Sequence, residues 1–105
     1  MKAHELLNAP QAWCQDSPAK DARGHKRYAS DPRAVSWCAL AAIHKVYAAS
    51  QREQAMERVL RALDVSERGL ACMSAADKAC CIMEWNDDRQ SSFPEVRAIL
   101  RQARV

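Results

Sequence analysis

The chain has 105 residues, of which 49% are hydrophobic and 28% are charged. This length and balance fit a single folded domain over residues 1–105 and exclude a disordered chain. Its 16 basic and 13 acidic residues give a formal charge of +3, an excess too small to indicate nucleic-acid binding by composition alone. With two glycines and four prolines, the composition favours helices over tight hairpins and predicts an all-α fold.

No apolar run approaches the roughly 20 residues of a membrane-spanning helix, and residues 1–10 carry no signal-peptide core. We therefore expect a cytoplasmic protein without a membrane segment. The cysteines at positions 14, 38, 72, 80 and 81 are odd in number, and two of them are adjacent. This pattern favours reduced, buried thiols over a disulfide framework.

Two segments precede the first strong helical signal. Residues 2–8 predict a short helix, because their apolar side chains share one face and Pro10 discourages continuation. Residues 10–30 combine prolines, a glycine and polar side chains, and they predict a long loop anchored by Trp13.

The strongest helical signal begins at Asp31. Asp31 followed by Pro32 is typical of an N-cap and a proline in the first helical turn. The apolar residues after them predict a helix over residues 32–49. Because apolar side chains occupy most of its circumference, we expect a compact bundle of about five helices around this central helix.

Three more helices are expected in the second half of the chain. Residues 51–64 carry a narrow apolar stripe, which is typical of a surface helix. A connector at 66–69 precedes Ser74 and Asp77, whose spacing is that of a capping box. Residues 93–104 predict the last helix. The inner face of the helix that starts at Ser74 is predicted to carry Ala76, Ala79, Cys80 and Met83.

The most distinctive pattern is a helix end followed by a new helix start. Asn86 and Asp87 compete for backbone hydrogen bonds and are expected to end the preceding helix at Trp85–Asn86. Ser92 and Glu95 have the spacing of a second capping box, which predicts the start of the last helix. These five residues are assigned as a structural corner.

The same corner offers an enzymatic alternative. Glu84, Asn86 and Asp87, with a cysteine, would suit a small metal-dependent or cysteine-based enzyme. No Cys-x2-Cys or His-x3-His pair is present, and His44 lies about 240° around a helix from Cys38. We therefore expect no catalytic residue, metal site or cofactor, and we keep the enzyme as an alternative.

Two basic clusters are candidate binding surfaces, one around residues 20–28 and one on the last helix. Cations beside an aromatic ring favour nucleic-acid binding, whereas exposed arginines on a terminal helix are typical of a solvated face. Acidic residues also dilute the first cluster. The candidate partner-binding residues are Arg23, Lys26, Arg27, Tyr28, Arg33, Arg97, Arg101 and Arg104.

Four short segments carry a further signal: Ala-Trp-Cys-Gln at 12–15, the Trp-Cys-Ala segment at 34–42, Ile82 to Asp87, and Glu95–Val96. Together they resemble a family of small uncharacterised proteins of bacteria and their phages. The chain departs from that pattern at Asp16 and Ala41, where glycine is expected. The family has no assigned activity, so the resemblance implies one compact domain and no catalytic residues. Its presence in mobile elements favours accessory or counter-defence roles.

These observations predict a non-catalytic protein that binds a macromolecule, most simply another protein. The sharper hypothesis is an inhibitor of a bacterial defence complex, such as a CRISPR effector, that uses the arginines of 23–33 or of the last helix. A homodimer is also expected, because a largely apolar central helix is hard to cover in a small bundle. The alternatives are the small enzyme and a nucleic-acid-binding protein.

Overall fold

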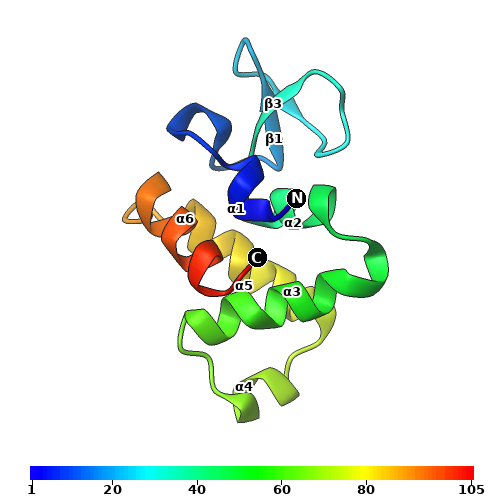
Figure 1. Cartoon of the computed structure of the whole chain (residues 1–105), viewed down its shortest axis with the longest axis vertical. Helices are drawn as coiled ribbons and strands as arrows, with labels where there is room; N and C mark the ends of the chain where they lie inside the picture. The colour runs from blue at the N-terminus through cyan, green and yellow to red at the C-terminus, as the bar shows by residue number, and fades with distance from the viewer.

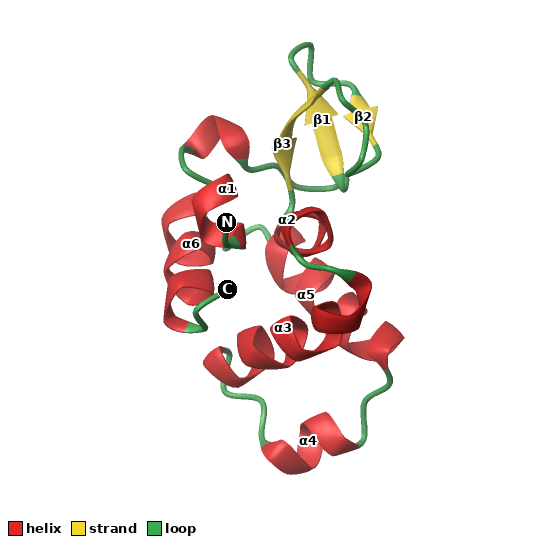
Figure 2. Ribbon diagram, turned by 45° about the vertical axis from the view of Figure 1, so that its right-hand side comes forward, coloured by secondary structure: helices red, strands yellow, loops and turns green.

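The computed structural model describes residues 1–105 and combines six α-helices with a small sheet. The prediction of an all-α fold is wrong, because residues 19–37 form a three-stranded antiparallel sheet in the order β2-β1-β3. Figures 1 and 2 show this sheet at one end of the molecule and the helices below it. The strands are β1 (Ala19–Asp21), β2 (Lys26–Arg27) and β3 (Ala34–Trp37). The helices are α1 (Ala3–Leu6), α2 (Ala39–Val46), α3 (Ala49–Ala62), α4 (Glu67–Ala71), α5 (Ala75–Asp87) and α6 (Phe93–Gln102), with a short 3-10 helix η1 (Pro10–Ala12).

The predicted central helix over 32–49 is divided between a strand and a short helix. Asp31 starts a turn, because its carboxylate accepts from the backbone N–H of Arg33 at 2.8 Å. The next residues then pair with β1, and α2 begins only after Cys38. The Sγ of Cys38 accepts from the backbone N–H of Ala41 at 3.3 Å and so caps α2. The sequence pattern was misleading because strand pairing depends on a distant segment.

The core lies among the helices of the lower part of the molecule. Helices α2 and α5 both pack on α3, and α1 packs on α2 and α6. The apolar stripes predicted for 51–64 and 93–104 are confirmed as the buried faces of α3 and α6. The largest fully buried apolar side chains are Leu7, Ile43, Val59, Leu60, Ile82, Val96, Leu100 and Val105. None of the helices has the length and apolar character needed to span a bilayer.

Helix α5 buries a different face from the one predicted. Lys78, Ile82 and Asn86, at four-residue spacing, are its buried residues, whereas Cys80 and Met83 are exposed. The apolar periodicity was misleading because two of the three inner residues are polar.

The inward position of Lys78 has a local electrostatic reason. Its side chain is 7% exposed, and its Nζ lies 3.4 Å from Oε2 of Glu57 and 3.5 Å from Oε1 of Glu53. Both glutamates belong to α3, so the ion pairs join α5 to α3. A buried ammonium group requires such partners, because an unpaired charge is costly to remove from water.

The two predicted capping boxes have different outcomes. At Ser74 the box is confirmed, since Ser74 Oγ accepts from the N–H of Asp77 at 3.1 Å and Asp77 Oδ2 accepts from the N–H of Ser74 at 2.9 Å. At Ser92 the prediction of a box with Glu95 is wrong, because Ser92 occupies the N-cap position of α6 without a side-chain cap bond. Proline at 94 already prepares the first turn of α6 for a helix.

This difference predicts unequal stability effects of two serine substitutions. Ser74→Ala is expected to lower the free energy of unfolding by about 1 kcal/mol, because it removes a cap acceptor. Ser92→Ala serves as the matched control and should cost less than about 0.5 kcal/mol. Urea unfolding followed by tryptophan fluorescence measures both. Equal losses would contradict the assignment of the caps.

Candidate functional site

The side chain of Asn86 joins three separate parts of the chain. It is 0% exposed, and its Oδ1 accepts from Nε1 of Trp13 at 2.7 Å and from the N–H of Ala39 at 2.9 Å. Its Nδ2 donates to the carbonyl of Cys14 at 3.1 Å and to Oδ1 of Asp87 at 2.9 Å. The amide therefore uses both of its donors and both lone pairs of its acceptor. It holds the end of α5, the segment after η1 and the start of α2 together.

The next two residues of that segment complete the attachment. The Nε2 of Gln15 donates to the carbonyls of Asn86 at 2.9 Å and of Asp88 at 3.0 Å. The N–H of Asp16 donates to Oδ1 of Asp87 at 3.0 Å. Asp16 has a φ of 64°, a left-handed conformation that glycine adopts without strain. Gln15 thus satisfies carbonyls that a helix end leaves without intrahelical partners.

The structure revises the role of the predicted corner. Helix α5 ends at Asp87, close to the predicted end, but the predicted reason is wrong, because the side chains of Asn86 and Asp87 do not bond to the backbone of their own helix. Asn86 instead bonds to Trp13, a residue 73 positions away in the sequence. Local spacing identified the region but not its partners, because no local pattern links Trp13 or Gln15 to Asn86. Trp13 is predicted as the anchor of its loop, whereas the only signal for Gln15 is its place in the 12–15 motif.

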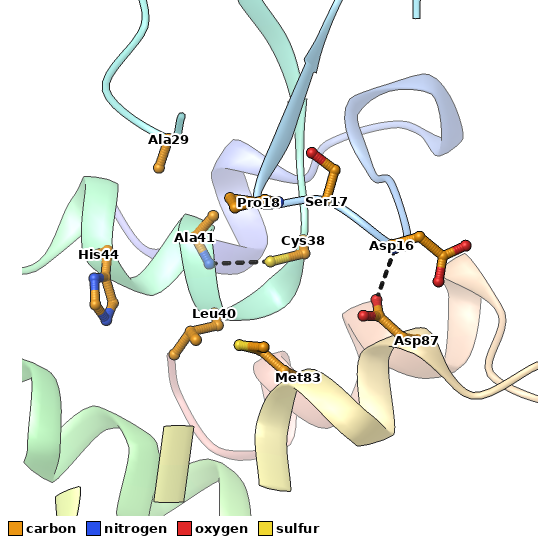
Figure 3. A pocket seen from close by; sticks show the side chains of 10 residues that line it. All are labelled: Asp16, Ser17, Pro18, Ala29, Cys38, Leu40, Ala41, His44, Met83 and Asp87. Carbon is orange, nitrogen blue, oxygen red and sulfur yellow. Dashed lines mark hydrogen bonds between the residues drawn. The ribbon is translucent and has the colours of Figure 1, made fainter. Parts of the chain in front are cut away.

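A cavity of about 350 Å³ lies beside Asp87. Figure 3 shows Asp16 and Asp87 at one end of the cavity, His44 at the other, and Met83 below it. The cavity therefore lies where the segment after η1, α2 and α5 meet. Its lining residues are Asp16, Ser17, Pro18, Ala29, Cys38, Leu40, Ala41, His44, Met83 and Asp87.

The cysteines near this cavity are poorly suited to nucleophilic chemistry. Burial raises the pKa of the Cys38 thiol to about 11, and burial also raises the pKa of Cys14. Both thiols are therefore protonated at neutral pH, whereas a nucleophile requires the thiolate. Cys38 is also engaged in capping α2. The other three cysteines, Cys72, Cys80 and Cys81, are free and exposed, so the expectation of buried thiols is wrong for them.

The side chains of the enzymatic alternative at the corner do not come together at one site. Glu84 does not line the cavity beside Asp87, and its Oε1 lies 3.6 Å from Sγ of Cys80. The amide of Asn86 is fully used in hydrogen bonds within the fold. No group of three or more His, Cys, Asp or Glu side chains is placed to hold a metal ion.

The residues 19–37, here called the sheet lobe, hold an unusual share of the charge. They contain five basic and two acidic residues, so their formal charge of +3 equals that of the whole chain. The remaining residues carry equal numbers of basic and acidic side chains. The sheet lobe lies at one end of the long axis of a molecule that measures 42 × 28 × 22 Å (Figures 1 and 2). The net positive charge is therefore concentrated at one end.

The carboxylate of Asp21 organises the turn between β1 and β2. It accepts from the backbone N–H groups of Arg23 at 2.9 Å and His25 at 3.0 Å. It also forms an ion pair with Nη2 of Arg27 at 2.9 Å. Gly24 has a φ of 80°, as the turn requires. The turn that presents the basic residues is thus built around one carboxylate, and the prediction of a loop over 10–30 is corrected to η1, β1, β2 and their connections.

The candidate cations of the sheet lobe differ in how they are held. Arg27 is paired with Asp21, and Arg33 is paired with Asp31 at 3.1 Å. Arg23 and Lys26 are exposed and form no ion pair. Tyr28 beside them is 82% exposed. The predicted cluster therefore contains both oriented and unpaired cations.

The second basic cluster lies apart from the first. Arg97, Arg101 and Arg104 lie at α6 and at the end of the chain, which belong to the helical part of the molecule in both views (Figures 1 and 2). Arg97 is half-buried, and its Nε donates to the carbonyl of His4 at 3.3 Å. The fold does not bring the two basic clusters into one surface.

Replacing Asn86 tests its role in joining three segments. Asn86→Ala is expected to lower the free energy of unfolding by about 3 kcal/mol, because it leaves buried donors and a buried carbonyl unpaired. Gln15→Ala is the control, since its half-buried amide bonds only to the end of α5, and it should cost about 1 kcal/mol. Urea unfolding measures both, and equal losses would argue against a dominant role for Asn86.

The Asp21 carboxylate predicts an acid-sensitive sheet lobe. Partial burial would raise its pKa, but hydrogen bonds from His25, Arg27 and Arg23 outweigh this effect and lower it to about 2. An unfolded aspartate has a pKa of about 3.9, so the carboxylate stabilises the fold above that pH and loses this effect as the pH falls towards 2. Asp21→Asn should be less stable than the parent at pH 7, and the difference should shrink between about pH 4 and 2. Urea unfolding across this range measures it, and a constant difference would contradict the prediction.

Comparison with known proteins defines the family. The model of a family of unknown function (DUF6197) matches residues 1–105. Searches of curated proteins and of solved structures give no match. The expected resemblance to a family without an assigned activity is thus confirmed, and the chain belongs to the DUF6197 family.

Proposed function

We propose that this protein is a non-catalytic binding protein whose sheet lobe docks on an acidic surface of a partner protein. The supporting observation is that the sheet lobe carries the whole net charge of the chain at one end of the molecule. A concentrated positive field accelerates encounter with an acidic partner and disfavours basic ones. The surrounding helical body carries no net charge that would oppose this steering.

The composition of the sheet lobe favours a protein over a nucleic acid. Arg27 and Arg33 are paired with internal carboxylates, which leaves few cations free to neutralise phosphates. Tyr28 is 82% exposed and Val35 is 49% exposed, and both offer contact area for a protein surface. Tyrosine and arginine are enriched at protein interfaces. Nucleic-acid binding is therefore the second candidate, to be distinguished by nuclease treatment.

The partner is expected to be a different protein. The reason for expecting a homodimer was an exposed apolar helix over 32–49, and α2 instead buries Ala39, Ala41, Ala42 and Ile43 within one chain. The inhibitor of a bacterial defence complex, such as a CRISPR effector, is a specific form of the present proposal. This form is supported by the resemblance to bacterial and phage proteins and by the small size of the chain. An inhibitor of such a complex would act in the cytoplasm.

Charge reversal tests the proposed surface. Arg23→Glu combined with Lys26→Glu should reduce retention of a partner by about tenfold or more, because it reverses the unpaired charge of the sheet lobe. Arg101→Glu combined with Arg104→Glu is the matched control, with the same charge change outside the lobe, and it should leave retention unchanged. Affinity purification from nuclease-treated bacterial lysate, including cells that express CRISPR effectors, measures retention by mass spectrometry. Cross-links between the partner and the lobe identify the contact.

Three outcomes would contradict the proposal. Loss of the partner in the control variant would place the surface on the last helix, and loss on nuclease treatment would favour nucleic-acid binding. If no protein is retained by the parent and lost from the lobe variant, a binding role for the lobe is rejected. Circular dichroism of each variant shows whether the fold is retained.

A further inference from the structure

We propose that the apolar cavity beside Asp87 and two cation-lined cavities next to it form one groove for an acidic peptide segment with a single large apolar side chain. The inference rests on the proposed function and specifies its partner: the acidic surface would include an extended segment with an apolar residue between acidic ones.

The three cavities adjoin because they share lining residues. The central cavity has a volume of about 350 Å³, and it shares Asp16, Ser17 and Pro18 with a neighbour of about 640 Å³. On another side it shares Ala29 and His44 with a cavity of about 420 Å³. The apolar cavity therefore has a polar cavity on each of two sides.

The central cavity suits an apolar side chain. Its walls include Pro18, Leu40, Ala41 and Met83, which approach from the segment before β1, from α2 and from α5 (Figure 3). Met83 is 44% exposed although it is apolar, and it lies at the edge of this cavity. An apolar side chain from a partner would cover it and gain free energy from the apolar area removed from water.

The two flanking cavities carry positive charge. The larger one is lined by three cations, Lys26, Arg27 and Arg33, and by Asp16 and Asp31. Arg27 and Arg33 are paired with aspartates, so Lys26 is its unpaired cation. The other is lined by Lys45 and Arg52, together with His44. The guanidinium of Arg52 is held in place, because its Nε and Nη2 donate to the carbonyls of Tyr47 at 3.0 Å and His44 at 2.9 Å. Carboxylates on both sides of an apolar anchor would match these charges.

The acidic groups along the groove are largely occupied by donors of the chain itself. The Oδ1 of Asp87 accepts from the N–H of Asp16 and from Nδ2 of Asn86. Asp31 is paired with Arg33. Asp16 and Asp87 both line the central cavity and neither forms an ion pair, so two carboxylates lie at one end of it (Figure 3). Three cations that form no ion pair, Lys26, Lys45 and Arg52, line the flanking cavities. Because they outnumber the two carboxylates and lie on both sides of the apolar cavity, the groove favours an acidic segment over a basic or purely apolar one.

Selection from a random peptide display library against the full chain tests the groove. The enriched peptides are expected to share a large apolar residue with acidic residues on both sides. For a synthetic peptide of that consensus, Met83→Trp should weaken binding about tenfold or more, because the indole would fill the cavity. Ala76→Trp is the matched control, an exposed alanine of the same helix that lines none of these cavities, and it should leave the affinity unchanged. Lys26→Glu and Lys45→Glu should each weaken binding, and fluorescence anisotropy measures all four variants.

The outcomes separate this inference from the proposed function. No enrichment, enriched peptides without acidic residues, or unchanged binding to Met83→Trp would each overturn the groove. If the groove fails while a partner still depends on Arg23 and Lys26, the lobe is the docking surface without the groove. If acidic peptides bind the groove but no partner depends on those two cations, the inference holds and the proposed docking surface fails.

Discussion

The buried amide of Asn86 is the constraint on which the arrangement of the molecule depends. Its oxygen accepts from the indole of Trp13 and from the first residue of α2, and its nitrogen donates to the carbonyl of Cys14. If any of these partners is missing, a buried polar group is left unpaired and the free energy of unfolding falls. The three segments must therefore come together or not at all. This explains why a polar residue lies among the fully buried side chains of α5.

The position of the sheet lobe follows from that constraint. Trp13 and Trp37 form an isolated parallel bridge, and the N–H of Cys14 donates to the carbonyl of Trp37 at 3.1 Å. The segment held by Asn86 thus also holds the last residue of β3, which leads into α2. The lobe, with its concentrated positive charge, is therefore presented on a fixed base rather than on a free loop.

The accuracy of the sequence-based predictions depended on how local each signal was. The apolar stripe of α3 and the box at Ser74 are set by residues three or four positions apart, and both were predicted correctly. Asp31 and Pro32 gave a misleading helix start, because the same residues also suit a turn. The inner face of α5 was missed because Lys78 and Asn86 are buried through partners on other elements.

The sequence by itself determined the positions of α3 and α6, the place where α5 ends, and the basic character of residues 20–33. Helical periodicity and capping are properties of neighbouring residues, which is why they can be read without a fold. Only the tertiary structure decided the sheet, the partners of Asn86, and the separation of the lobe cations from those of α6. These features depend on strand pairing and hydrogen bonds between distant residues, and such contacts leave no local spacing to recognise.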